Sequence, residues 1–190
     1  DANAMAVHVN GDRIFLSGDV TLADIMALPA MLAKAEAEGR PFREVVLRTS
    51  NGGALISGEW LQAVIRTAGL NTIVSGRCIS SCSIMQSGGV ERYMAGDLPT
   101  EVDSVQIHAA SSGGRVTYGP SPRMFGIYAG NYGGGMDEEL LYKALFQVTQ
   151  PNGLLVFADP ARTNGDSVSF DPDGTGRAEE RSEERRVGKE

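Results

Sequence analysis

Three short stretches of the sequence contain residue types that together support nucleophilic chemistry. Ser80 lies at the expected start of a helix, where backbone N–H groups without helical partners stabilise a negatively charged oxygen. His108 ends an apolar stretch, and a neutral imidazole is the usual base that activates a serine hydroxyl. Gly52 and Gly53 offer backbone N–H groups that no side chain shields. These residues predict a nucleophile, a base and an oxyanion hole.

Each of these residues also has a purely structural interpretation. A serine at a helix start is commonly an N-cap, a glycine pair in a loop is commonly a turn, and a half-buried histidine is commonly satisfied by a neighbouring group. The other histidine, His8, lies in a predicted hairpin and is expected to face solvent or to pack. The appearance of donors, nucleophile and base at successive strand ends favours the functional interpretation.

The hydrophobic pattern predicts an α/β fold in which strands alternate with helices and form a mainly parallel sheet. The expected elements are a hairpin at 7–16, a helix from Thr21 to Gly39 that Pro29 kinks or restarts, strands at 44–49, 71–75, 90–94 and 104–108, a helix around 61–68, a short buried helix at 80–87, and mostly helical structure from Tyr118 to Gln150, broken at 133–135. Residues 160–180 are expected to be irregular. Ligands of such sheets bind beyond the carboxyl ends of the strands, where the candidate residues fall.

Composition excludes several classes of protein. The net charge is -7, and the basic and acidic residues of 177–190 cancel, so the acidic balance belongs to residues 1–176. Nucleic acid is therefore not an expected partner, because phosphate binding depends on clustered Lys and Arg. No apolar run approaches ~18 residues, so no membrane-spanning segment is expected.

We expect residues 1–176 to form one domain and residues 177–190 to be a charged tail. Residues 181–190 resemble the translation of a DNA sequencing adapter and are expected to be foreign to the natural chain; a charged, solvated helix is the alternative. The chain starts at Asp1 without an initiator Met or a leader, so we expect a fragment that lacks its natural start.

Cys78 and Cys82 are the only cysteines. Their spacing allows a disulfide in an oxidising compartment and equally allows two buried thiols. Structural zinc needs about four ligands, and no Cys/His cluster completes such a set, so no metal site is expected. No pattern of residues marks a cofactor site either.

Three motifs resemble the Clp-protease-like serine peptidases of the ClpP/crotonase superfamily, especially its exported, stand-alone bacterial members, over roughly residues 12–112. Ser50-Asn-Gly-Gly53 is similar to the family's Ser-Pro-Gly-Gly loop, with Asn51 in place of proline. Gly76-Arg-Cys-Ile-Ser-Ser-Cys82 is similar to Gly-x-Cys-x-Ser-Ala-Cys. Val105-Gln-Ile-His108 matches a Val-x-Ile-His strand end. The resemblance implies a ββα spiral fold.

The resemblance also implies a site. It makes Ser80 the nucleophile and His108 the general base, and it places the oxyanion hole at the backbone of Gly52, Gly53 and Ser81. Neither cysteine occupies the position of the nucleophile.

An acidic residue should accept the second imidazole N–H of a catalytic histidine. Asp159 lies near the expected place downstream, and Asp137 is its competitor. Asp137 precedes two glutamates after a glycine run and fits better as the charge of a helix start. We therefore expect Asp159 to be the third residue, with a Ser-His dyad and an inactive relative as open alternatives.

The leading hypothesis is a serine peptidase that cleaves peptide or protein substrates without a cofactor. The resemblance further implies a homo-oligomer, a periplasmic or otherwise exported location, and membrane association through a preceding segment, with a cytoplasmic location left open. The alternatives are a catalytically inactive module that binds a peptide or partner, and an acyl-CoA-binding crotonase relative. Ser80 and His108, at peptidase positions, count against the crotonase alternative.

Overall fold

The computed structural model describes residues 4–100, 102–163, 167–175 and 179–180. The strands are β1 (Ala6–Asn10), β2 (Arg13–Ser17), β3 (Glu44–Ser50), β4 (Asn71–Ile79), β5 (Arg92–Met94), β6 (Ser104–Ile107), β7 (Ser111–Ser112), β8 (Arg115–Val116), β9 (Leu154–Ala158), β10 (Val168–Asp171) and β11 (Glu179–Glu180). The helices are α1 (Asp24–Ala37), α2 (Leu55–Thr67), α3 (Ser81–Ser87), α4 (Ser121–Tyr132), the short 3₁₀ helix η1 (Gly133–Gly135) and α5 (Glu138–Phe146).

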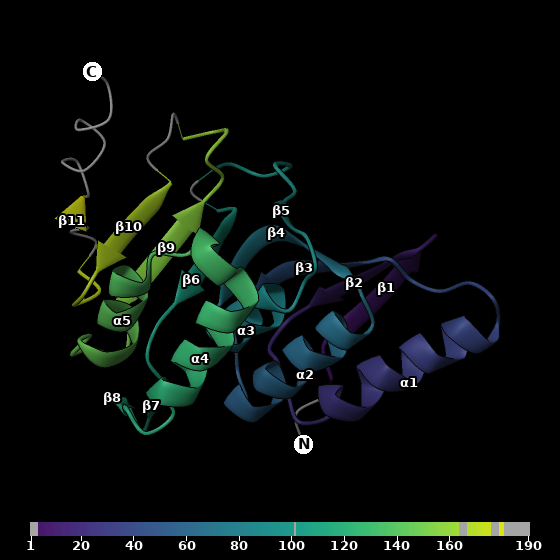
Figure 1. Ribbon diagram of the computed structural model, residues 1–190, viewed down its shortest axis with the longest axis horizontal. Coiled ribbons are helices and arrows are strands. Elements are labelled where there is room, and N and C mark those ends of the chain that lie inside the picture. The colour runs from purple at the N-terminus through teal and green to yellow at the C-terminus, as the bar shows by residue number, and fades with distance from the viewer. Residues whose placement is uncertain (1–3, 101, 164–166, 176–178, 181–190) are drawn as a thin grey trace.

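One mixed sheet organises the described residues. Its strands follow the order β1-β2-β3-β4-β6-β9-β10-β11, and β5 also pairs with β4 (Figure 1). The centre is parallel: β3 pairs with β2 and β4, and β4 pairs with β5 and β6. The margins are antiparallel, because β1 pairs with β2, and β9, β10 and β11 continue from β6 in alternating directions. The predicted α/β class is confirmed, with a parallel centre between antiparallel margins.

The helices form a row that follows the strand order, from α1 on the right of Figure 1 to α5 on the left. Ile65 of α2 and Leu47 of β3 are fully buried in one core cluster, and Leu141 of α5 and Ile107 of β6 are fully buried in a second. Each such side chain stabilises the fold by about 1.5–3 kcal/mol relative to exposure. The two clusters hold the central strands β3, β4 and β6 against helices and so fix the strand ends.

The observed elements differ from the expected ones in several places, and no expected element corresponds to β7, β8 or β9. Helix α1 runs through Pro29 as one helix. Strand β4 continues to Ile79, so that Ser80 follows it directly. The expectation of irregular structure at 160–180 is wrong for β10, because Phe170 is buried in the second core cluster and its strand pairs with β9.

The far C-terminal part of the chain bears on two predictions. Strand β11 lies in the segment 177–190 that we expect to be a charged tail, and it pairs with β10. Residues 181–190, expected to be foreign sequence, lie outside the described residues.

None of the helices within the described ranges combines the length and apolarity needed to cross a membrane.

Candidate active site

The turn between β4 and α3 holds Ser80 in an unusual backbone conformation. Ser80 has φ 58° and ψ -123°. Residues other than glycine rarely adopt this backbone conformation, which costs them about 1–3 kcal/mol. Its N–H donates to the carbonyl of Gln106 at 2.9 Å, which fixes it beside β6. Its half-buried hydroxyl makes no hydrogen bond to any other described residue. The turn therefore presents a serine hydroxyl at the carboxyl end of β4.

The loop after β3 approaches this turn so closely that only glycine fits. Gly52 has φ 93°, and a Cβ there would lie 2.6 Å from the Cβ of Ser80. Gly53 has φ 137°, and a Cβ there would lie 2.1 Å from the carbonyl oxygen of Val20. The backbone of Val20 in turn donates to the Gly52 carbonyl at 2.6 Å and accepts from the N–H of Ala54 at 2.8 Å. The glycine pair is thus clamped between Val20 and Ser80.

Two backbone N–H groups remain as candidate oxyanion donors. The Ser81 N–H is the first of α3 and has no partner within the helix. The Gly53 N–H has no acceptor among the described residues. The hydroxyl of Ser81 donates to the Gly53 carbonyl at 2.9 Å and so ties the two donor segments together. The Gly52 N–H, by contrast, already donates to the Ser50 hydroxyl at 3.2 Å, which corrects its predicted role as a donor.

His108 lies at the same end of the sheet as Ser80. Strand β6 pairs in parallel with β4, with Gln106 opposite Ile79, and His108 directly follows β6. Its Nδ1 lies 2.6 Å from the carbonyl oxygen of Ala109. Because a carbonyl only accepts, Nδ1 carries the proton and Nε2 keeps its lone pair. Burial lowers the pKa of His108 below the ordinary 6.5, and the Ala109 carbonyl opposes this shift.

The structure brings Ser80 and His108 to one edge of the sheet but does not join them. Among the described residues, no hydrogen bond links the Ser80 hydroxyl to the His108 ring. Catalytic hydrogen bonds are often long or misaligned before substrate binds. The two side chains therefore lie at one edge of the sheet without a hydrogen bond between them.

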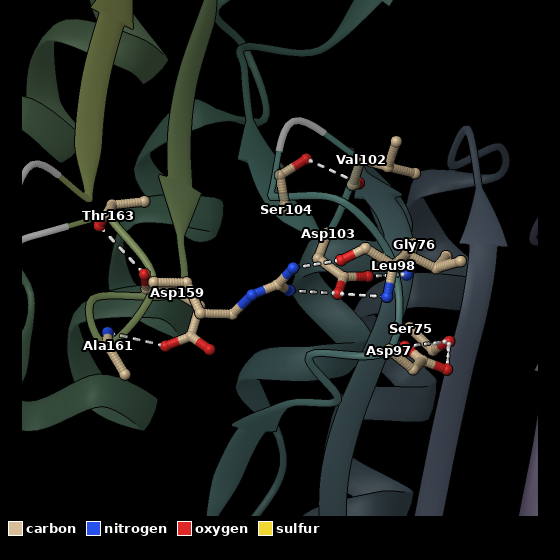
Figure 2. Close-up of polar contacts among 11 residues, drawn as sticks. Ser75, Gly76, Asp97, Leu98, Val102, Asp103, Ser104, Asp159, Ala161 and Thr163 are labelled. Carbon is tan, nitrogen blue, oxygen red and sulfur yellow. Dashed lines mark hydrogen bonds and ion pairs between the residues drawn. The ribbon is translucent and has the colours of Figure 1, made fainter.

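Asp159 is at the wrong end of β6 to serve as the third residue of a triad. Strands β6 and β9 are antiparallel, with Ser104 opposite Ala158, so Asp159 lies beside the start of β6. His108 follows the other end, roughly 15 Å away along the strand. The carboxylate of Asp159 accepts from the Ala161 N–H at 2.9 Å instead (Figure 2). The prediction of Asp159 as the partner of His108 is wrong in this structure.

The group that accepts from His108 is a backbone carbonyl, that of Ala109. Sequence reasoning missed it because every residue carries a carbonyl and no side chain marks the position. The competitor, Asp137, is the N-cap of α5, where its carboxylate accepts from the N–H groups of Glu139 and Leu140. Asp137 thus has the helix-start role that its sequence context indicates.

A buried carboxylate that the sequence analysis also missed stabilises the strand leading to Ser80. Asp103 is fully buried and accepts from the N–H of Gly76 at 2.6 Å and of Leu98 at 3.3 Å (Figure 2). The guanidinium of Arg162 reaches the same carboxylate at 3.0 Å. Gly76 has φ 100° and lies so close to Thr49 that a Cβ would come within 2.3 Å of its hydroxyl. Asp103 thus holds the irregular part of β4 from which the Ser80 turn continues.

Cys78 and Cys82 form a disulfide across this turn, which resolves the alternative that the sequence leaves open. Both side chains are fully buried. Within the ranges that the structure describes, no group of three or more His, Cys, Asp or Glu side chains is arranged to hold a metal ion.

Comparisons with known proteins do not assign the chain to a family. No protein-family model matches the sequence, and no curated protein matches it significantly. The resemblance to Clp-protease-like peptidases therefore stays a prediction that rests on the three motifs.

Proposed function

We propose that this chain is a serine hydrolase that cleaves peptide bonds, with a ClpP/crotonase-like spiral fold. Ser80 attacks the substrate carbonyl, and His108 accepts the serine proton through Nε2 and then delivers it to the amine that leaves as the C–N bond breaks. Water then hydrolyses the acyl-Ser80 ester, with His108 again as the base, and releases the second product. The N–H groups of Gly53 and Ser81 hold the developing oxyanion. The observation that carries this proposal is the turn at Ser80, with its positive φ, packed against Gly52 between two available N–H donors.

The environment of His108 supports its role as the base. Since burial lowers the pKa of His108, the ring is neutral at neutral pH and ready to accept a proton. The Ala109 carbonyl fixes the tautomer, as a carboxylate does in a full triad. A carbonyl dipole stabilises the imidazolium less than a full negative charge does. We therefore expect a slower enzyme than one with a complete triad.

The disulfide supports an exported location, because disulfides persist mainly in oxidising compartments. A homo-oligomer is carried over from the family resemblance. The substrate class is peptide or protein, and the proposed mechanism needs no cofactor.

One observation favours a second candidate, a peptide-binding module without catalysis. Within the described residues the Ser80 hydroxyl and the His108 ring share no hydrogen bond, and the partner of His108 is a carbonyl rather than a carboxylate. The same edge of the sheet would then bind a peptide without cleaving it.

A fluorophosphonate probe tests the proposal, because it reacts covalently with an activated serine. We expect wild-type protein to be labelled, and Ser80→Ala and His108→Ala to lose the labelling. His8→Ala is the matched control, since His8 lies on the exposed strand β1 and should label like wild type. Labelling of both Ser80→Ala and His108→Ala at the wild-type level would contradict the proposal. A folded protein that binds peptides but does not react with the probe would favour the peptide-binding module. A titration with a CoA thioester tests the crotonase alternative.

A further inference from the structure

The Cys78–Cys82 disulfide encloses the residues that the proposed chemistry depends on. Cys78 lies in β4 and Cys82 in the first turn of α3, and the crosslink spans Ile79, Ser80 and Ser81. Ser80 is the proposed nucleophile and Ser81 supplies one of the two oxyanion donors. The crosslink thus joins the strand and the helix on either side of the strained residue.

A crosslink over so short a loop is a poor general stabiliser. The entropy that a disulfide removes from the unfolded chain grows with the length of the loop it closes, and this loop has a sequence separation of four. The crosslink also restricts the conformations open to the turn at Ser80, which it encloses.

The surroundings of the two sulfurs indicate that reduction would leave the fold in place. Both cysteines belong to the first core cluster, with Val74, Leu61 and Met85 among its buried members. Buried thiols behave as small apolar groups, so they are compatible with an apolar environment once the two sulfurs have moved apart. The backbone bonds of Ser80, from its N–H to Gln106 and from the Ile84 N–H to its carbonyl, keep α3 attached to the sheet. What reduction removes is the covalent restraint on the turn.

We infer that the Cys78–Cys82 disulfide is a positioning element for Ser80, so that the site is competent only in the oxidised protein. The inference rests on the proposed function. A dithiol reductant would pass two electrons and two protons to the disulfide, giving two cysteine thiols and the oxidised disulfide of the reductant. The turn at Ser80 would then relax from its positive φ, and the hydroxyl and the Ser81 N–H would leave the positions that the reaction needs. Such a protein reacts slowly in a reducing compartment and becomes fully active after oxidation.

The experiment compares oxidised, reduced and re-oxidised wild-type protein, with the thiol state verified by mass spectrometry. Displacing a catalytic group by about 1 Å costs roughly a hundredfold in rate, so we expect fluorophosphonate labelling to slow by about ten- to a hundredfold on reduction and to recover on re-oxidation. Hydrogen exchange of residues 79–84 should quicken in the reduced protein. The segment 138–146, which forms α5 in the other core cluster, is the internal control and should not change.

A double variant provides the same test if the buried disulfide resists reduction. Cys78→Ala with Cys82→Ala should reproduce the reduced state in both readouts and should not respond to the reductant. Unchanged labelling and unchanged exchange in verified dithiol protein would overturn the inference. Fast exchange in both segments would also overturn it, because the disulfide would then be a general stabiliser. If the oxidised protein does not label at all, the proposed function fails, and the exchange comparison still decides whether the disulfide positions the turn.

Discussion

The two ends of β6 use polar groups in opposite ways. At the start of the strand, the buried carboxylate of Asp103 accepts from two backbone N–H groups and from Arg162. At the other end, the Ser80 hydroxyl and the Gly53 N–H have no partner among the described residues, although the backbone around them is tightly clamped. Ser80 is only half-buried and Gly53 is exposed, so these unused groups are open to a ligand. We call the start of β6, where the Asp103 network lies, the closed end. We call the other end of the strand, near Ser80, the open end.

The largest expected effect is a loss of unfolding free energy when the Asp103 network at the closed end is broken. Asp103→Ala removes the acceptor of Gly76, Leu98 and Arg162, and breaking a buried pair by removing one partner costs about 3–5 kcal/mol. Urea denaturation should show this loss of unfolding free energy. Asp12→Ala is the control, because its carboxylate is 54% exposed and lies 3.7 Å from Arg43, a geometry worth about 0–1 kcal/mol. A small loss at Asp103, similar to that at Asp12, would show that the network does not stabilise the fold.

The next largest effect is expected from Gly52, whose backbone packs against the turn at Ser80. Gly52→Ala places a Cβ 2.6 Å from that of Ser80 and forces alanine into φ 93°. We expect it to lower stability by about 1–3 kcal/mol and to abolish probe labelling, because the Ser80 turn must shift. Gly113→Ala is the matched control: it also has positive φ, at 57°, but meets no atom within 4 Å. Labelling that survives in Gly52→Ala would argue that the close approach has no role in the site.

A smaller change in stability, this time a gain, is expected from a substitution at Ser80. Ser80→Gly relieves a positive φ that only glycine adopts without strain, against the larger chain entropy of glycine in the unfolded state. The net expectation is a gain of about 0.5–1 kcal/mol in stability with complete loss of labelling. Ser80→Ala keeps the Cβ and should lose labelling without that gain. A Ser80→Gly protein less stable than Ser80→Ala would contradict the assignment of strain to this turn.

The finest test of the open end is the dependence of labelling on pH. The reaction needs neutral His108, so its rate should fall as the pH drops through the pKa of this residue. Since burial lowers that pKa against the weaker influence of the Ala109 carbonyl, the midpoint should lie below 6.5. A labelling profile from pH 4 to 8 measures it, and a midpoint above 6.5 would place the ring in a different environment.

Local patterns predicted the open end better than the closed one. The Asn10-Gly11 hairpin, the loop after β3 and the Ser80 turn all follow from short stretches of sequence, and parallel pairing of β4 with β6 brings Ser80 and His108 to one edge. The position of Asp159 could not be predicted, because it depends on the direction of β9, a strand far along the chain. For the same reason Asp103 went unnoticed: its donors come from three separate segments.

The most direct test of the central claim is to locate the site of covalent reaction. Oxidised wild-type protein is treated with a fluorophosphonate at neutral pH, digested, and mapped by mass spectrometry. We expect one adduct, on Ser80, that is absent from His108→Ala protein of unchanged stability. An adduct on another serine, or an equal yield on Ser80 without His108, would contradict it.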